Sequence, residues 1–93
     1  MLKTISIIVS GKVQGVFFRQ SCREKAIALG ITGEVKNMPD DTVHIIATST
    51  AEKLEQFSAW CRQGPPRAKV MSVYIAELPT QTFERFIISR NPN

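Results

Sequence analysis

Residues 11–19, with the sequence GKVQGVFFR, combine the residue types best suited to chemistry in this chain. They follow an alternating apolar stretch and precede one with helical periodicity, so they are predicted to join a strand to a helix. The N-terminus of a helix carries unpaired backbone N–H groups and a partial positive charge, which favour an anion. Gly11 and Gly15 let the backbone approach a ligand closely, and Arg19 adds a planar fork of donors. The segment is therefore predicted to bind phosphate.

On spacing alone, other interpretations of this loop remain open. A Gly-x-x-x-Gly segment is often only a turn, and a surface arginine is often only solvated. No Gly-Lys-Ser/Thr sequence follows the loop, so nucleoside triphosphate chemistry is disfavoured. Asn37, near the end of the second predicted strand, is a further polar candidate close to the loop. On spacing alone, a role for this asparagine in the turn at residues 38–41 is favoured.

A second phosphate-related pattern lies at residues 61–67, CRQGPPR, which has the Cys-x-x-Gly-x-x-Arg spacing of cysteine-dependent phosphatases. Two prolines remove donors that such a loop needs, and Cys61 falls at the end of a helix rather than at its start. This interpretation is disfavoured. Cys22 and Cys61 are predicted to be buried thiols, although a single disulfide between their helices stays open. Neither the cysteines nor the lone His44 has metal-site spacing, so no metal is expected.

The elements that must position these residues follow from periodicity and from turn signals. A capping box of Ser49 and Glu52 is predicted to begin the second helix. The apolar parity changes between Val70 and Met71, which predicts a bulge or a bend. In chain order, the expected elements are a strand at 3–10, a helix from residue 18 or 19 to residue 29 ended by Gly30, strands at 31–38 and 43–48 joined by a hairpin, a helix ended by Gly64-Pro65-Pro66, an extended segment at 67–78 and a short strand at 82–89.

This order, β-α-β-β-α-β with room for one extra edge strand, predicts an α+β fold. We expect a ferredoxin-like split βαβ sandwich, with a mostly antiparallel sheet and two helices on one face. Ninety-three residues make a single domain, 1–93. The open sheet face is expected to show only one aromatic side chain, which disfavours an RNA-binding module. The residues expected on that face are Thr4, Ser6, Ile8, His44, Ile46 and Tyr74.

Composition narrows the class of protein further. The chain is 43% hydrophobic and 22% charged, which is ordinary for a globular protein and argues against disorder. Its apolar runs are far shorter than the roughly 20 residues that cross a bilayer, and its start lacks the apolar core of a signal peptide. A cytoplasmic monomer without membrane contact is the simplest expectation. The net charge of +4 favours anionic ligands without choosing among them.

Three ordered motifs resemble those of the acylphosphatase family over essentially the whole chain. GKVQGVFFR resembles the family's signature loop, Gly-x-Val-Gln-Gly-Val-x-Phe-Arg. ALGITGEVKN is similar to its second signature, Gly-x-x-Gly-x-Val-x-Asn. FSAWCRQGPPRAKV fits the family's Trp, Gly-Pro and Ala-x-Val pattern after the second helix.

The resemblance implies hydrolysis of a small-molecule acyl phosphate to a carboxylate and inorganic phosphate, the latter as product and inhibitor. It implies in-line attack by a water held by Asn37, with no metal, cofactor, covalent intermediate or nucleic acid. Arg19 would pair with the phosphoryl group, and the backbone cradle would comprise Gln14, Gly15, Val16, Phe17 and Phe18. The alternative is a phosphate- or nucleic-acid-binding ferredoxin-like module without catalysis.

The chain departs from the family pattern in three places. Asp40-Asp41 stands where the family usually has Asp-Gly in the hairpin. A left-handed Asp41 would cost up to about 1–2 kcal/mol of stability. Ser10 replaces a common histidine, and Glu34 a common aromatic residue, which bears on rate and substrate preference. Phe17 and Met38 are candidates for tuning the acyl side, while the physiological acyl phosphate does not follow from these residues.

Overall fold

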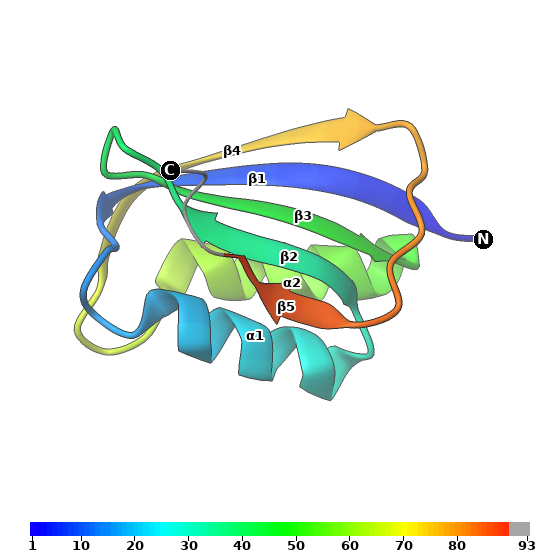
Figure 1. The fold of residues 1–93 in the computed structure, drawn as a ribbon, viewed down its shortest axis with the longest axis horizontal. Coiled ribbons are helices and arrows are strands. Elements are labelled where there is room, and N and C mark those ends of the chain that lie inside the picture. The colour runs from blue at the N-terminus through cyan, green and yellow to red at the C-terminus, as the bar shows by residue number, and fades with distance from the viewer. Residues whose placement is uncertain (90–93) are drawn as a thin grey trace.

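Five strands form one sheet, and two helices pack against one of its faces (Figure 1). The structure, a computed structural model, describes residues 1–89. In chain order the elements are β1 (Lys3–Lys12), α1 (Phe18–Leu29), β2 (Thr32–Asn37), β3 (Val43–Ser49), α2 (Ala51–Gln63), β4 (Lys69–Leu78) and β5 (Phe86–Ile88). The predicted ferredoxin-like α+β fold is confirmed.

The strand order across the sheet is β4-β1-β3-β2-β5. All neighbouring pairs are antiparallel except the last, in which β5 runs parallel to β2. The extra edge strand that the sequence left open is β5, which is only three residues long. It extends the sheet beyond β2, on the side of α1 (Figure 1).

The core lies between the sheet and the two helices. Along β1, Ile7 and Val9 are fully buried on the helix side, as the alternation predicts. Phe18 and Cys22 of α1 are buried against this layer. From the other helix and the edge strand, Phe57 and Phe86 meet edge to face, with ring centroids 6.0 Å apart. This packing holds the N-terminal end of α1 beside the ends of β1 and β2.

A bulge bends the sheet where β1 leads into the loop. Ser10 pairs with Ser72, but the next residue, Gly11, pairs with Val70, so Met71 is the extra residue on β4. The predicted break between Val70 and Met71 is confirmed. Gly11 has φ +122°, and a Cβ there would lie 2.2 Å from the Lys69 carbonyl oxygen, so only glycine fits.

The start of the second helix differs from the sequence prediction by one residue. The N-cap of α2 is Thr50, whose side chain accepts a hydrogen bond from the Lys53 amide at 3.4 Å. Ser49 is instead the buried last residue of β3, where it pairs with Lys3. The predicted Ser49–Glu52 capping box is therefore wrong, because strand pairing takes the residue that would have formed the cap.

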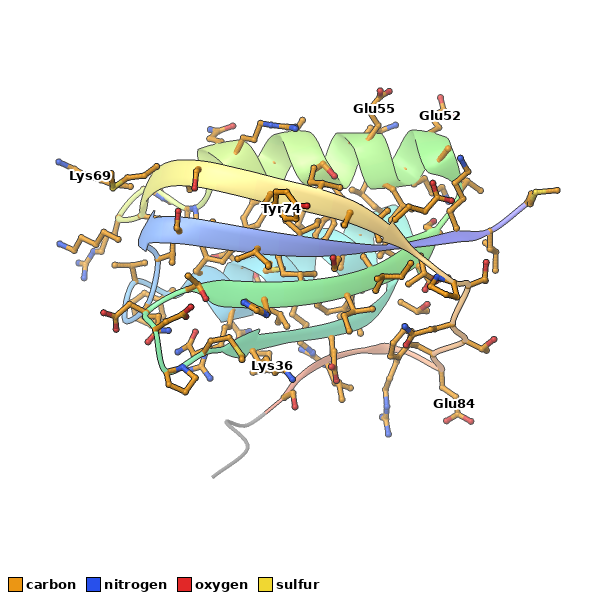
Figure 2. All side chains as sticks on the ribbon, turned by 90° about the horizontal axis from the view of Figure 1, so that it is seen from above. Lys36, Glu52, Glu55, Lys69, Tyr74 and Glu84 are labelled. Carbon is orange, nitrogen blue, oxygen red and sulfur yellow. The ribbon has the colours of Figure 1, made fainter. Side chains whose placement is uncertain are left out.

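The open face of the sheet is also smaller than predicted, because Thr4 does not belong to it. Thr4 is fully buried, its hydroxyl lies 2.7 Å from that of Thr48, and it accepts a hydrogen bond from the Gln81 amide at 2.8 Å. The connection from β4 to β5 covers this end of the sheet. The remaining face is seen in Figure 2, where Tyr74, which is 66% exposed, lies on β4 and Lys36 on β2.

No helix within residues 1–89 is both long enough and apolar enough to span a membrane.

Candidate active site

A cleft of about 580 Å³ lies at the end of the sheet where β1 leads into α1. The β1–α1 loop and the β2–β3 hairpin meet at this end of the molecule (left in Figure 1). The cleft is lined by residues from the loop, the first turn of α1 and the last residues of β2 and β5. These residues are Val13, Gly15, Phe17, Phe18, Arg19, Gln20, Asn37 and Ile88.

The loop enters α1 without a side-chain cap. Phe17 occupies the N-cap position in a left-handed conformation, with φ +63° and ψ +24°, and its side chain makes no capping hydrogen bond. The first turn of α1 also contains no acidic residue. Gly15 has φ +72°, a conformation that glycine adopts without strain. The first N–H groups of the helix thus lack a side-chain acceptor, which leaves them suited to an external anion.

Arg19 supplies the formal charge of the cleft. It stands on the first turn of α1, is partly exposed and lines the cleft together with the loop. No aspartate or glutamate is among the described residues that line the cleft. The guanidinium and the positive end of the helix therefore act on a bound anion together, without a carboxylate competing for it.

Asn37 reaches the same cleft from the end of β2. Its Oδ1 is buried and accepts no hydrogen bond from any residue that the structure describes. Buried polar atoms are normally hydrogen-bonded, so an unpartnered oxygen facing a cleft marks a position for a polar ligand. Sequence spacing left the position of Asn37 open, and the structure brings it together with Arg19.

Gln14 has a role that the sequence did not indicate. Its Nε2 donates hydrogen bonds to the Met38 and Thr42 carbonyl oxygens, each at 2.9 Å. The side chain thus ties the loop to the two ends of the β2–β3 turn. Gln14 and Val16, both predicted to belong to the phosphate cradle, are not among the residues that line the cleft, and Val16 is packed in the core.

Three cleft residues were not predicted from the sequence, namely Val13, Gln20 and Ile88. Gln20 follows Arg19 on α1, and Ile88 ends β5. Arg23 Nε donates to the Phe86 carbonyl at 3.2 Å, which attaches β5 to α1. Met38, a sequence candidate for the acyl side, does not line the cleft. No local signal in the sequence indicates that an isoleucine on the last strand reaches a loop that begins at residue 11.

The hairpin beside Asn37 closes as a tight turn. The Met38 amide donates to the Thr42 carbonyl at 2.9 Å, and the Asp41 amide to the Met38 carbonyl at 3.1 Å. Asp41 has a left-handed conformation, with φ +71°. The Thr42 hydroxyl and amide both donate to the Asp40 carboxylate, which lowers the pKa of Asp40. This exposed turn holds the end of β2 in place.

The two cysteines lie away from the cleft. Cys22 on α1 and Cys61 on α2 are both fully buried free thiols, as predicted. Burial, together with the neighbouring Cys61 thiol, raises the pKa of Cys22. Cys61, the nucleophile that the Cys-x-x-Gly-x-x-Arg pattern would require, is fully buried and does not line the cleft, so the arrangement does not fit a cysteine-dependent phosphatase. Within residues 1–89 no three His, Cys, Asp or Glu side chains group to hold a metal ion.

A sequence model of the acylphosphatase family matches residues 5–88. This chain belongs to the acylphosphatase family. The family predicted from the three sequence motifs is thereby confirmed, and with it the enzyme class, an acyl phosphate hydrolase. A protein named acylphosphatase from Methylococcus capsulatus is 41% identical over 91 residues, which make up 97% of this chain and 99% of that protein.

Solved structures of acylphosphatases resemble this one closely. An acylphosphatase from Coxiella burnetii is 38% identical with a TM-score of 0.92, and the match covers 95% of this chain and 93% of that one. The acylphosphatase from Bacillus subtilis is 34% identical with a TM-score of 0.91, and the match covers 96% and 99% of the two chains.

Proposed function

We propose that this acylphosphatase binds the phosphoryl group of its substrate in the backbone cradle of residues 14–18, pairs it with Arg19 and attacks it with a water held by Asn37. The observation that carries the proposal is the convergence of three groups on one cleft. They are the uncapped start of α1, the Arg19 guanidinium and the buried, unpartnered Asn37 Oδ1.

The chemistry needs few groups because a carboxylate is a good leaving group. The water oxygen forms a bond to phosphorus while the bond from phosphorus to the acyl oxygen breaks, and the carboxylate leaves with that electron pair. Asn37 Oδ1 accepts a hydrogen bond from the water and orients it for in-line attack. The amide is a poor base, so one proton of the water passes to a phosphoryl oxygen while the other stays on the attacking oxygen, which yields dihydrogen phosphate. Catalysis then rests on positioning and on stabilisation of charge.

The positive groups of the cleft make metal assistance unnecessary in this proposal. The Arg19 guanidinium can bind two phosphoryl oxygens at once. The N–H groups of the cradle and the helix dipole supply further positive potential. No cofactor and no covalent intermediate is required. Inorganic phosphate offers the same oxygens to the cradle, so it acts as product and as competitive inhibitor.

The proposal also covers the domain organisation, the location and the oligomeric state of the protein. Residues 1–93 act as one domain and as a cytoplasmic monomer. Both sheet edges are poorly suited to pairing with another chain, because β4 is bulged at Met71 and β5 has three residues. The open face has one exposed aromatic ring, Tyr74, so it offers little to stack nucleic acid bases.

Hydrolysis of benzoyl phosphate in ¹⁸O-labelled water, with and without EDTA, tests the mechanism. Attack on phosphorus by water places the label in inorganic phosphate, and we expect the rate to be unaffected by the chelator. Label in benzoate would show attack on the carbonyl carbon, and loss of activity in EDTA would require a metal. Either result would contradict the proposal that Asn37 and Arg19 support attack by water on phosphorus without a metal ion.

A further inference from the structure

We infer that Phe17 and Ile88 form an apolar wall that binds the acyl group, so that the preferred substrates carry bulky apolar or aromatic acyl groups. This inference rests on the proposed function, because it takes the polar side of the cleft to hold the phosphoryl group. It adds the class of acyl group and names Ile88, on the far end of the chain, as a specificity-determining residue.

The cleft is larger than a phosphoryl group needs. Its volume of about 580 Å³ falls in the range of roughly 300–1,000 Å³ typical of sites for whole organic ligands. Its polar groups belong to the start of α1 and the end of β2, where Arg19 and Asn37 lie. The rest of the lining includes Phe17 and Ile88, which offer no donor to a phosphate. A second, apolar part of the substrate fits this remaining space.

Phe17 is held in a position that packing does not explain. It is a bulky residue in a left-handed conformation, which is rare and strained outside glycine and asparagine. Its side chain is 69% exposed, so the strain is not offset by burial in the core. Strained residues with exposed apolar side chains gather at ligand sites, where the ligand completes the contact. The ring lines the cleft, where it can cover an acyl group.

Ile88 reaches the cleft through the sheet register. It pairs with Val35 on β2, and Asn37 lies two residues further along that strand. Side chains two residues apart on a strand point to the same face, so Ile88 and Asn37 share the side of the sheet on which α1 lies. The hydrogen bond from Arg23 to the Phe86 carbonyl holds β5 against α1. Ile87, the neighbour of Ile88, points to the other face and does not line this cleft.

The positive charge of the cleft disfavours cationic acyl groups. Among residues 1–89, no carboxylate lines the cleft, and Arg19 is the charged side chain of its lining. A cationic acyl group, such as an aminoacyl group, would meet a like charge without a compensating anion. A small polar acyl group would leave Phe17 and Ile88 without a partner. The wall therefore favours apolar acyl groups over both.

The test compares kcat/KM for benzoyl phosphate and acetyl phosphate in the wild type and in variants. The ratio of the two values is compared between variants, so the different intrinsic reactivities of the substrates cancel. Ile88→Ala and Phe17→Asn are each expected to lower the benzoyl-to-acetyl ratio about five- to tenfold, the scale of lost apolar contact in a pocket. Asparagine is chosen at position 17 because it tolerates the left-handed conformation. Ile88→Thr keeps a branched residue on β5 and serves if the alanine variant does not fold.

Ile87→Ala is the matched control, and its ratio should equal that of the wild type. The inhibition constant of inorganic phosphate reports on the polar side of the cleft. In the Ile88 variants it should change by a smaller factor than the benzoyl-to-acetyl ratio of kcat/KM does. A ratio unchanged in folded Ile88→Thr and Phe17→Asn would overturn the inference while acyl phosphate hydrolysis stands. A wild type that hydrolyses neither substrate would instead overturn the proposed function.

Discussion

Gln14 Nε2 donates a hydrogen bond to the Met38 carbonyl oxygen at 2.9 Å and a second one to the Thr42 carbonyl oxygen at the same distance. These bonds join the loop at the start of α1 to the turn that follows Asn37. The proposed phosphate cradle and the residue proposed to hold the water belong to segments that are far apart in the sequence, and the Gln14 side chain couples their positions.

Replacing Gln14 should therefore affect turnover through geometry. Gln14→Ala removes one of the two donors of the Met38 carbonyl and one of the two donors of the Thr42 carbonyl, and the loss of both hydrogen bonds should cost about 1–3 kcal/mol of unfolding free energy. We expect kcat to fall more than the affinity for phosphate does, because Asn37 loses its support. Gln14→Glu should be worse, since a carboxylate would face two carbonyl oxygens. Gln56→Ala, exposed on α2, is the control in denaturation and kinetic measurements. Equal behaviour of Gln14→Ala and the control would refute the coupling.

Arg19 should be needed for phosphate binding and for turnover alike. Arg19→Ala should nearly abolish both hydrolysis and inhibition by inorganic phosphate. Arg19→Lys should recover little, because one ammonium group does not span two phosphoryl oxygens. Arg62→Ala, exposed at the end of α2, controls for loss of charge alone. Activity near the wild-type level in the lysine variant would remove Arg19 from the site.

Asn37 should act on turnover more than on binding. Asn37→Ala should lower kcat by at least about 100-fold, the scale seen when a positioned polar group is lost. Inhibition by phosphate should persist, because its donors are the loop backbone and Arg19. Asn37→Asp should harm both, since its charge would repel phosphate and pair with Arg19. Steady-state kinetics with phosphate as inhibitor separates the cases, and weakened phosphate affinity at constant kcat would make Asn37 a phosphate ligand instead.

The hairpin offers a matched pair of adjacent aspartates. Asp41 has φ +71°, so Asp41→Gly should relieve strain and raise the unfolding free energy by about 0.5–1 kcal/mol. Asp40→Gly should do the opposite, because it removes the carboxylate that accepts from the Thr42 amide and hydroxyl. Thermal denaturation of both variants measures the difference. Stabilisation by both changes would contradict the assignment of strain to Asp41 alone.

The buried thiols should support the fold and leave the chemistry alone. Cys22→Ser with Cys61→Ser should lose about 1–3 kcal/mol of stability if the buried hydroxyls are unpaired, and the folded fraction should keep its activity. Because its pKa is raised, the Cys22 thiol makes the free energy of unfolding depend on pH. Its contribution to stability is complete below the pKa of the thiol in the unfolded chain and is lost as the pH rises toward the raised value. Denaturation across alkaline pH should show this loss in the wild type and not in the double variant.

The helices and strands of this fold can be predicted from short stretches of the sequence. Alternation in β1 places Ile7 and Val9 inside, and helical spacing places Cys22 on the inner stripe of α1, because backbone geometry fixes the period of each element. The error at the start of α2 shows the limit of such signals. Ser49 and Thr50 are both good caps by type, and only the pairing of Ser49 with Lys3 decided between them.

The sequence by itself determined the family, the fold class and the loop that begins at residue 11, since each depends on residue types at short, regular spacings. Only the tertiary structure decided which distant residues share the cleft. The hydrogen bonds of Gln14 to the hairpin, the unpartnered oxygen of Asn37 and the reach of Ile88 depend on strand order and register. Strand order and register are determined by the packing of the whole sheet against two helices, and no local sequence pattern indicates them.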